Sequence, residues 1–101
     1  MNTDRVYTCV IEYFATGEGF HVYIGVVRAS GRMQAIRLFR DHFKFFNNPR
    51  GWNYFKKGMV VKSGLDKSVL NSYLSSSLIS NIERTPSFEN VFFELNFHSI
   101  L

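Results

Sequence analysis

The residues of this chain that could do chemistry are one cysteine and three histidines: Cys9, His21, His42 and His98. Nucleophilic catalysis requires a nucleophile, a general base and a group that orients the base. Cys9 lies in the apolar run VYTCVIEYF, which is typical of a small buried side chain rather than of a reactive thiol. His42 belongs to a phenylalanine-rich stretch and is expected to be packed, whereas His21 and His98 could approach each other across a sheet. We therefore predict no catalytic residue and no enzymatic activity.

The sequence also predicts no metal site and no cofactor. A single cysteine excludes a multi-cysteine zinc site, and two histidines without neighbouring acids are a poor ligand set. The glycines of GEGFHVYIG lie in a predicted hairpin, so they do not form a phosphate-binding loop between a strand and a helix. One catalytic hypothesis stays open, a nuclease built from a few bases and one histidine. It requires a cleft that joins His21 or His98 to a carboxylate, and the acids of the predicted strands and turns lie at edge or outward positions: Glu12, Glu18, Glu89 and Glu94.

The basic residues are concentrated in the middle of the chain. Residues 28–67 hold ten bases and two acids, a net charge of +8, whereas the remainder holds two bases and six acids, a net charge of −4. Charge separated in this way predicts an electrically two-sided molecule whose basic side meets an acidic partner. The alternative is that these bases are only the solvated surface of the fold. The ten bases are Arg28, Arg32, Arg37, Arg40, Lys44, Arg50, Lys56, Lys57, Lys62 and Lys67.

Two parts of this basic segment are predicted to form a binding surface. In a predicted helix, three bases recur at i, i+3 and i+7 on the side opposite the apolar face. After it, NNPRGWNYFKKG (residues 47–58) combines turn-forming residues with three aromatic rings and three bases. Such a mixture suits protein interfaces, where Trp, Tyr and Arg dominate the binding energy, and equally suits nucleic acids, whose bases stack on rings. The predicted partner-binding residues are Arg37, Arg40, Lys44, Arg50, Trp52, Tyr54, Lys56 and Lys57.

The rings of this loop could instead anchor it to the core. If residues 47–58 are extended, Trp52 and Tyr54 point to one side and Phe55 to the other. We expect Phe55 to lie in the core and Tyr54 to be half exposed. The sequence leaves Trp52 open between a core position and a partner contact.

Hydrophobic spacing predicts four strands and two helices. Ser30 and Asp66 are expected to cap the helices, and three consecutive serines weaken the second half of the second helix. Gly25, inside the second strand, predicts a bulge or the close approach of another element to the backbone. The predicted elements are strands over 5–15, 20–29, 58–64 and 89–101 and helices over 31–46 and 67–83.

This order, β-β-α-β-α-β, is typical of an α+β fold. We predict a single globular domain over residues 1–101, with about four strands in a mostly antiparallel sheet and one long and one shorter helix packed on one face. The helices would cover the face that carries Val22, Ile24 and Val26. The opposite face would then expose apolar side chains, which is typical of interaction surfaces and would suit a homodimer. These side chains are Tyr7, Cys9, Ile11, Tyr13, Tyr23, Val27 and Phe92.

Composition places the chain among globular proteins. Hydrophobic residues make up 46% and charged residues 20% of it, and no apolar run is long enough to cross a membrane. The N-terminal residues MNTDRVYT lack the apolar core of a secretory signal, and one cysteine excludes an internal disulfide. An intracellular, cytoplasmic setting is therefore expected.

In size, aromatic content and lack of catalytic motifs, the chain resembles small accessory proteins of phages and mobile elements, including anti-CRISPR and other anti-defence inhibitors. The resemblance is one of scale and composition, and it assigns no functional residue. Many such inhibitors are acidic mimics of nucleic acid, a pattern from which the basic middle of this chain departs. We predict a small non-enzymatic binding protein that docks on a protein or nucleoprotein partner and blocks or modulates it. The alternative is a nucleic-acid-binding domain that uses the same basic helix and aromatic loop.

Overall fold

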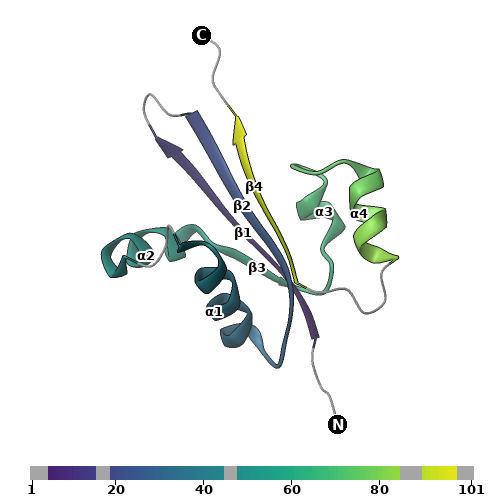
Figure 1. Cartoon of the computed structure of the whole chain (residues 1–101), viewed down its shortest axis with the longest axis horizontal. Helices are drawn as coiled ribbons and strands as arrows, with labels where there is room; N and C mark the ends of the chain where they lie inside the picture. The colour runs from purple at the N-terminus through teal and green to yellow at the C-terminus, as the bar shows by residue number, and fades with distance from the viewer. Residues whose placement is uncertain (1–4, 16–18, 45–47, 85–89, 98–101) are drawn as a thin grey trace.

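The structure, a computed structural model, describes residues 5–15, 19–44, 48–84 and 90–97. Its centre is a four-stranded sheet in the order β3-β1-β2-β4, in which every neighbouring pair is antiparallel (Figure 1). The predicted α+β class with a four-stranded antiparallel sheet is confirmed. The strands are β1 (Arg5–Ala15), β2 (Gly19–Ala29), β3 (Val60–Ser63) and β4 (Val91–Phe97), and the helices are α1 (Arg32–His42), α2 (Pro49–Phe55), the 3₁₀ helix η2 (Lys56–Gly58), α3 (Lys67–Leu70) and α4 (Ser76–Glu83).

The β1–β2 hairpin forms the centre of the sheet. Its register runs without interruption from Arg5↔Ala29 to Ala15↔Gly19, so both strands pair over their full eleven residues. Gly19 has a φ of 89°, the left-handed conformation that glycine adopts without steric cost. The two predicted strand boundaries are confirmed, apart from the addition of Gly19. The rest of the predicted TGEG turn lies outside the described residues.

Helix α1 is shorter at both ends than predicted. Its N-cap is Gly31, which makes no side-chain cap, so Ser30 is not the capping residue that the sequence predicts. Instead, the backbone N–H and the hydroxyl of Ser30 both donate to Gln34 Oε1, at 2.6 and 2.8 Å. The helix ends at His42 because Phe43 adopts an extended conformation, with φ −91° and ψ 91°. The last residues of the predicted helix, 45 and 46, lie outside the described residues.

The segment predicted as a turn is largely helical. Residues 49–55 form α2 and residues 56–58 form η2. The Trp52 backbone N–H donates to Asn48 O at 2.8 Å, the bond of a first helical turn. The prediction that Trp52 and Tyr54 point to the same side, which assumed an extended chain, is therefore wrong. Residues two apart on a helix face in nearly opposite directions.

The second predicted helix is two short helices. Asp66 caps α3 as predicted, since its Oδ1 accepts from the Val69 backbone N–H at 3.0 Å. After Leu70 the chain leaves helical geometry, and α4 starts at Ser76 with Ser75 as its cap. The serine run that weakens a continuous helix thus supplies the start of a new one. Residues 76–83, for which the sequence left helix in doubt, are helical.

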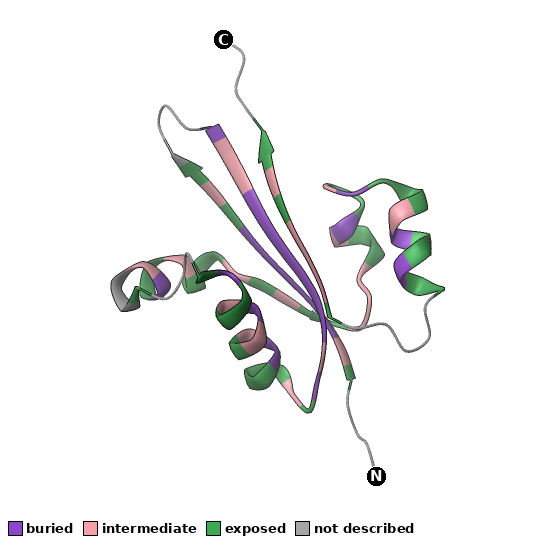
Figure 2. Ribbon diagram, in the orientation of Figure 1, coloured by how far each residue is buried: buried purple, intermediate pink, exposed green. Residues whose placement is uncertain are grey.

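The helices cover both faces of the sheet, which corrects the prediction that they share one (Figure 1). On one face α1 and α2 pack on the side chains that were expected to be exposed. On the other face α3 and α4 pack on Val22, Ile24 and Val26. The α1-face core contains Tyr7, Cys9, Ile11, Tyr23, Val27, Ala29, Ala35, Phe39, Phe43 and Trp52, and Phe92 packs against it. Figure 2 shows buried positions on the two central strands and on the helices of both faces.

Gly25 explains how α1 approaches the sheet so closely. A Cβ atom at this position would lie 2.9 Å from Phe39 Cδ2 and 3.2 Å from Phe92 Cδ1. The absence of a side chain therefore gives the two rings their space, and the predicted close approach is confirmed. In the described ranges, no helix has the length and apolarity that crossing a membrane requires.

Candidate functional site

Trp52 lies where α2 meets α1, and it is a core residue. Its side chain is buried, with 8% of its surface exposed, and it belongs to the same core cluster as Ala35 and Phe39 of α1. The Arg40 guanidinium carbon lies 5.4 Å from the centre of the Trp52 ring, which is within cation–π range. The sequence left Trp52 open, and the structure gives it both a core position and a basic neighbour.

Two hollows lie beside Trp52 and α1, and together they are called the basic groove below. The larger hollow has a volume of about 460 Å³ and reaches η2 and β3, and the smaller, of about 220 Å³, runs along α1. Both are bounded by Met33, Ile36 and Trp52. The larger is also lined by Arg32, Lys56, Lys57, Met59 and Val61, and the smaller by Arg37, Arg40 and Asp41.

Helical and strand periodicity account for how these side chains converge. Met33, Ile36 and Arg37 stand at i, i+3 and i+4 of α1, and Arg40 follows at i+7, so the four lie on one stripe. Phe39 and Ala35 lie on a different stripe and are buried against the sheet. Met59, which directly precedes β3 in an extended conformation, and Val61 of β3 are two residues apart and point to the same side.

The groove combines an apolar floor, formed by Met33, Ile36 and Trp52, with a basic rim. Met33 is 76% exposed, an unusual degree for a large apolar side chain. None of the rim cations forms an ion pair with a described residue, although Asp41 borders the smaller hollow. The charge of the rim is therefore available to a partner. These cations are Arg32, Arg37, Arg40, Lys56 and Lys57.

The structure brings together five of the eight predicted binding residues. Arg37, Arg40, Trp52, Lys56 and Lys57 all border the basic groove. Trp52, Lys56 and Lys57 reach the groove because α2 and η2 are helical, a conformation that the sequence does not predict.

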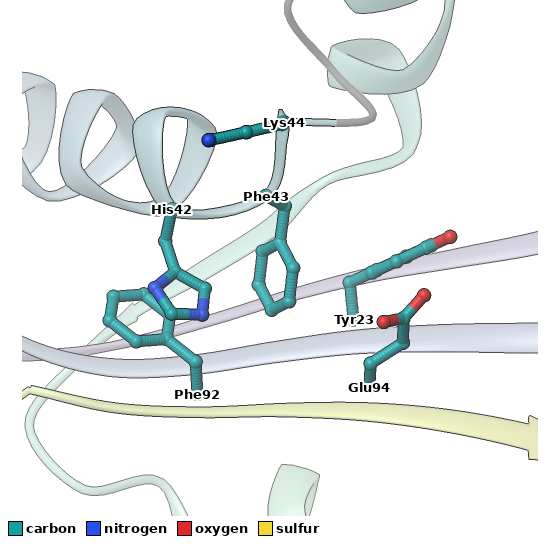
Figure 3. Close-up of a pocket in the computed structure, with 6 residues that line it drawn as sticks. All are labelled: Tyr23, His42, Phe43, Lys44, Phe92 and Glu94. Carbon is teal, nitrogen blue, oxygen red and sulfur yellow. The ribbon is translucent and has the colours of Figure 1, made fainter.

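The other three predicted residues lie elsewhere or cannot be placed. Lys44 follows the end of α1 and borders a separate hollow of about 400 Å³ with Tyr23, Phe43 and Glu94 (Figure 3). Tyr54 is 69% exposed, more than predicted, and lines another hollow with Phe55 and Lys57. The side chain of Arg50 lies outside the described part of the structure.

Sequence reasoning missed the residues that make the groove apolar and part of its rim. Met33 and Ile36 could have been found, since they precede Arg37 and Arg40 on the same helical stripe. Arg32 was counted among the bases of the chain but was not assigned to the surface. The sequence predicts Met59 and Val61 only as strand residues, and their part in the groove depends on how β3 is placed relative to α1.

Among the described residues considered for catalysis, His42 and Glu94 line one hollow, whereas Cys9 and His21 do not line it. His42 stacks on the Phe92 ring at 3.7 Å between ring centres and borders the hollow in Figure 3. His21 lies beside Tyr13, at 5.9 Å between ring centres, and its Nε2 is buried without a hydrogen-bond partner in the described structure. His98 lies outside the described residues. Among the residues that the structure describes, no three potential metal ligands converge.

Cys9 is buried, as its apolar neighbours in the sequence predict, although it lies on the sheet face that the sequence analysis expects to be exposed. The side chain is completely buried in the α1-face core. Burial raises the pKa of the Cys9 thiol to about 12, and the positive charge of nearby Arg32 opposes this shift in part. The thiol is therefore neutral at ordinary pH.

Comparison with protein-family models, with curated protein sequences and with solved structures gives no significant match for this chain. A functional assignment therefore depends on the geometry of the basic groove.

Proposed function

We propose that this protein is a small non-enzymatic binding protein that docks on an acidic face of a protein or nucleoprotein partner and blocks or modulates that partner. The observation that carries the proposal is the basic groove, where Trp52, Met33 and Ile36 bound two hollows with a cationic rim. A partner that supplies carboxylates to the rim and apolar atoms to the floor would satisfy both parts of the surface.

The floor of the groove favours a protein partner over a bare nucleic acid. Phosphates would use the rim cations but would leave the exposed Met33 side chain without a contact. Trp52 is poorly suited as a stacking platform for bases, because it is largely buried and Arg40 lies over its ring. Aromatic and arginine side chains around an apolar centre are the composition of binding hot spots in protein interfaces.

Nucleic-acid binding is the second candidate function, and Tyr54 is the observation that favours it. Its ring is 69% exposed and lines a hollow with Lys57, so a base could stack beside a phosphate contact. Single-stranded nucleic acid is the form that this arrangement would take.

The resemblance in size and composition to phage and mobile-element accessory proteins supports an inhibitory role, of the anti-CRISPR or other anti-defence kind, inside a cell. The predicted homodimer surface is covered by α1 and α2 in the protomer. Any self-association would therefore use other residues than those first expected.

A charge-reversal experiment tests the proposed function. Fluorescence anisotropy would measure the binding of labelled polyglutamate, a single-stranded oligonucleotide and a short duplex, each at 50 and 200 mM salt. The double variant Arg37→Glu/Lys56→Glu changes one rim residue of each hollow. The control Arg5→Glu/Arg84→Glu changes the net charge equally at residues that do not line either hollow.

We expect polyglutamate to bind to the wild type at low salt and binding to weaken at least about tenfold in the groove variant, with little change in the control. Equal losses in both variants, or no binding of any anionic probe at low salt, would contradict a docking role for the groove. Tighter binding of the single strand than of polyglutamate, lost in Tyr54→Ala, would establish the second candidate instead. Nucleic-acid binding would fall by orders of magnitude between the two salt concentrations if several phosphates are contacted.

A further inference from the structure

The groove consists of two hollows, and their number constrains the kind of partner more closely than the charge of the rim does. We propose that the basic groove binds a short acidic protein segment that inserts two large apolar side chains, one into each hollow. This inference rests on the proposed function and deepens it, because it names the kind of segment that the partner presents.

The shape of the groove supports two anchors. The hollows have volumes of about 460 and 220 Å³ and share a boundary formed by Met33, Ile36 and Trp52, so they are neighbours. Two side chains on one face of a partner segment, such as those at i and i+4 of a helix, lie about 5–6 Å apart at their Cβ atoms. Amphipathic helices place such pairs of anchors in neighbouring apolar hollows of a groove.

The rim sets the charge of the segment around those anchors. Three cations border the larger hollow, and Arg37 and Arg40 border the smaller. Because none of them is paired with a described acid, an uncharged or basic segment would leave the rim without counter-charges. Glu and Asp residues flanking the anchors supply those counter-charges, and a basic segment is repelled. The three cations of the larger hollow are Arg32, Lys56 and Lys57.

The two methionines of the groove indicate that the fit is adaptable. Met33 and Met59 have unbranched, polarizable side chains that adjust to different apolar shapes. The presence of two anchors should therefore matter more than whether they are Leu, Ile or Phe.

Labelled synthetic peptides of equal length test the inference on the full chain, with anisotropy as the readout. The first peptide is rich in Glu and carries two leucines four positions apart. In the second peptide both leucines are serine, and in the third every Glu is Lys. Polyglutamate is included as the reference that the proposed function itself predicts to bind.

We expect the leucine peptide to bind at least about tenfold tighter than the serine peptide, because burial of two large apolar side chains is added to the charge contacts. The lysine peptide should not bind. In the protein, Met33→Ser should remove most of the advantage of the leucine peptide, and Phe97→Ser, which changes an exposed apolar residue far from the groove in sequence, should not. Both positions are exposed, so neither variant removes a buried core side chain.

The outcomes separate this inference from the proposed function. If polyglutamate binds but the leucine and serine peptides bind equally, the groove recognises charge alone and the two-anchor inference is overturned while the proposed function stands. If the leucine peptide binds better but Met33→Ser and Phe97→Ser behave alike, the anchors do not enter this groove and the inference is again overturned. If neither polyglutamate nor any acidic peptide binds, the proposed function fails and the inference fails with it.

Discussion

At the scale of single residues, Cys9 shows what burial does to a reactive group. Its side chain has no exposed surface, and β1 carries it between β2 and β3. Burial raises the pKa of the thiol to about 12 from an ordinary value of 9.0, because the charged thiolate loses its hydration. Since the thiolate is the nucleophile, the folded protein protects this cysteine from thiol reagents.

We predict that Cys9 reacts with a thiol reagent only through unfolding. At pH 8 the folded chain holds roughly a thousandfold less thiolate than the unfolded chain, a ratio that follows from the pKa difference. The same shift predicts how stability depends on pH. Below pH 9.0 the thiol is protonated in both states, and as the pH rises from 9.0 to about 12 the unfolded state loses the proton first, so stability falls.

Labelling rates with a disulfide reagent at increasing urea concentrations would measure this protection. The rate should rise in parallel with the unfolded fraction, and the alkaline loss of stability should be smaller in Cys9→Ala. Rapid labelling in the absence of urea would contradict the buried position of Cys9.

The sequence predicts Cys9 well and Trp52 poorly, for a physical reason. The conformation around Cys9 is that of a long strand, which an eleven-residue pattern predicts, but the sequence does not predict that α1 buries its face of the sheet. The environment of Trp52 depends on whether a seven-residue segment is helical, and Pro49 and Gly51 there are typical of a turn. Tertiary packing overrides local propensity in so short a segment, and the sequence of the segment alone does not carry that information.

At the scale of elements, the serine run between α3 and α4 decides where the chain restarts a helix. Ser75 Oγ accepts from the Leu78 backbone N–H at 3.2 Å, which satisfies one of the free donors at the start of α4. Ser76 follows directly, and it is exposed within the first turn. Two adjacent serines therefore have different roles, although the sequence shows them as equivalent.

We predict that Ser75→Ala lowers the free energy of unfolding by about 1 kcal/mol, the usual cost of removing an N-cap. Ser76→Ala is the matched control, and because alanine is the better helix former it should leave stability unchanged or raise it by a few tenths of a kcal/mol. Urea denaturation followed by circular dichroism would measure both variants. Equal effects of the two substitutions would mean that Ser75 does not cap α4 in solution.

The elements that the sequence predicts best are those whose patterns are longest. Both long strands were found with their boundaries, and Asp66 was found as a cap, because their signals are local. The division of the second helix was signalled only as weak propensity over the serines. The basic groove was predicted in part, since Arg37 and Arg40 follow from the stripe on α1, whereas Met59 and Val61 join it through tertiary packing.

At the scale of the whole molecule, one sheet carries two cores. The α1-face core and the α3/α4-face core lie on opposite sides of the same strands, and alternate residues of β2 contribute to each. The sequence already contained the signal, because both faces of the long strands are apolar. We interpreted the second apolar face as an interaction surface, whereas a sheet buried on both sides explains it without a partner.

This arrangement predicts that both cores unfold together. Ile79 of α4 is 3% exposed and packs only in the α3/α4-face core, so Ile79→Ala should lower the free energy of unfolding by about 2–5 kcal/mol. Trp52, the one tryptophan of the chain, lies in the other core and reports on it by fluorescence. Because β2 is shared, the loss at α4 should shift the Trp52 transition by the same amount as the circular dichroism transition.

Urea denaturation, with both signals recorded on the same samples, tests this coupling. The control is Ser80→Ala on the exposed side of α4, which should change the free energy of unfolding by less than about 0.5 kcal/mol. Coincident shifts would show that binding energy gained at the basic groove, beside Trp52, stabilises the opposite core as well. A Trp52 transition that stays at the wild-type midpoint while the circular dichroism signal shifts would mean that the two faces unfold separately. In that case the stability of the core beside the groove would not depend on α3 and α4.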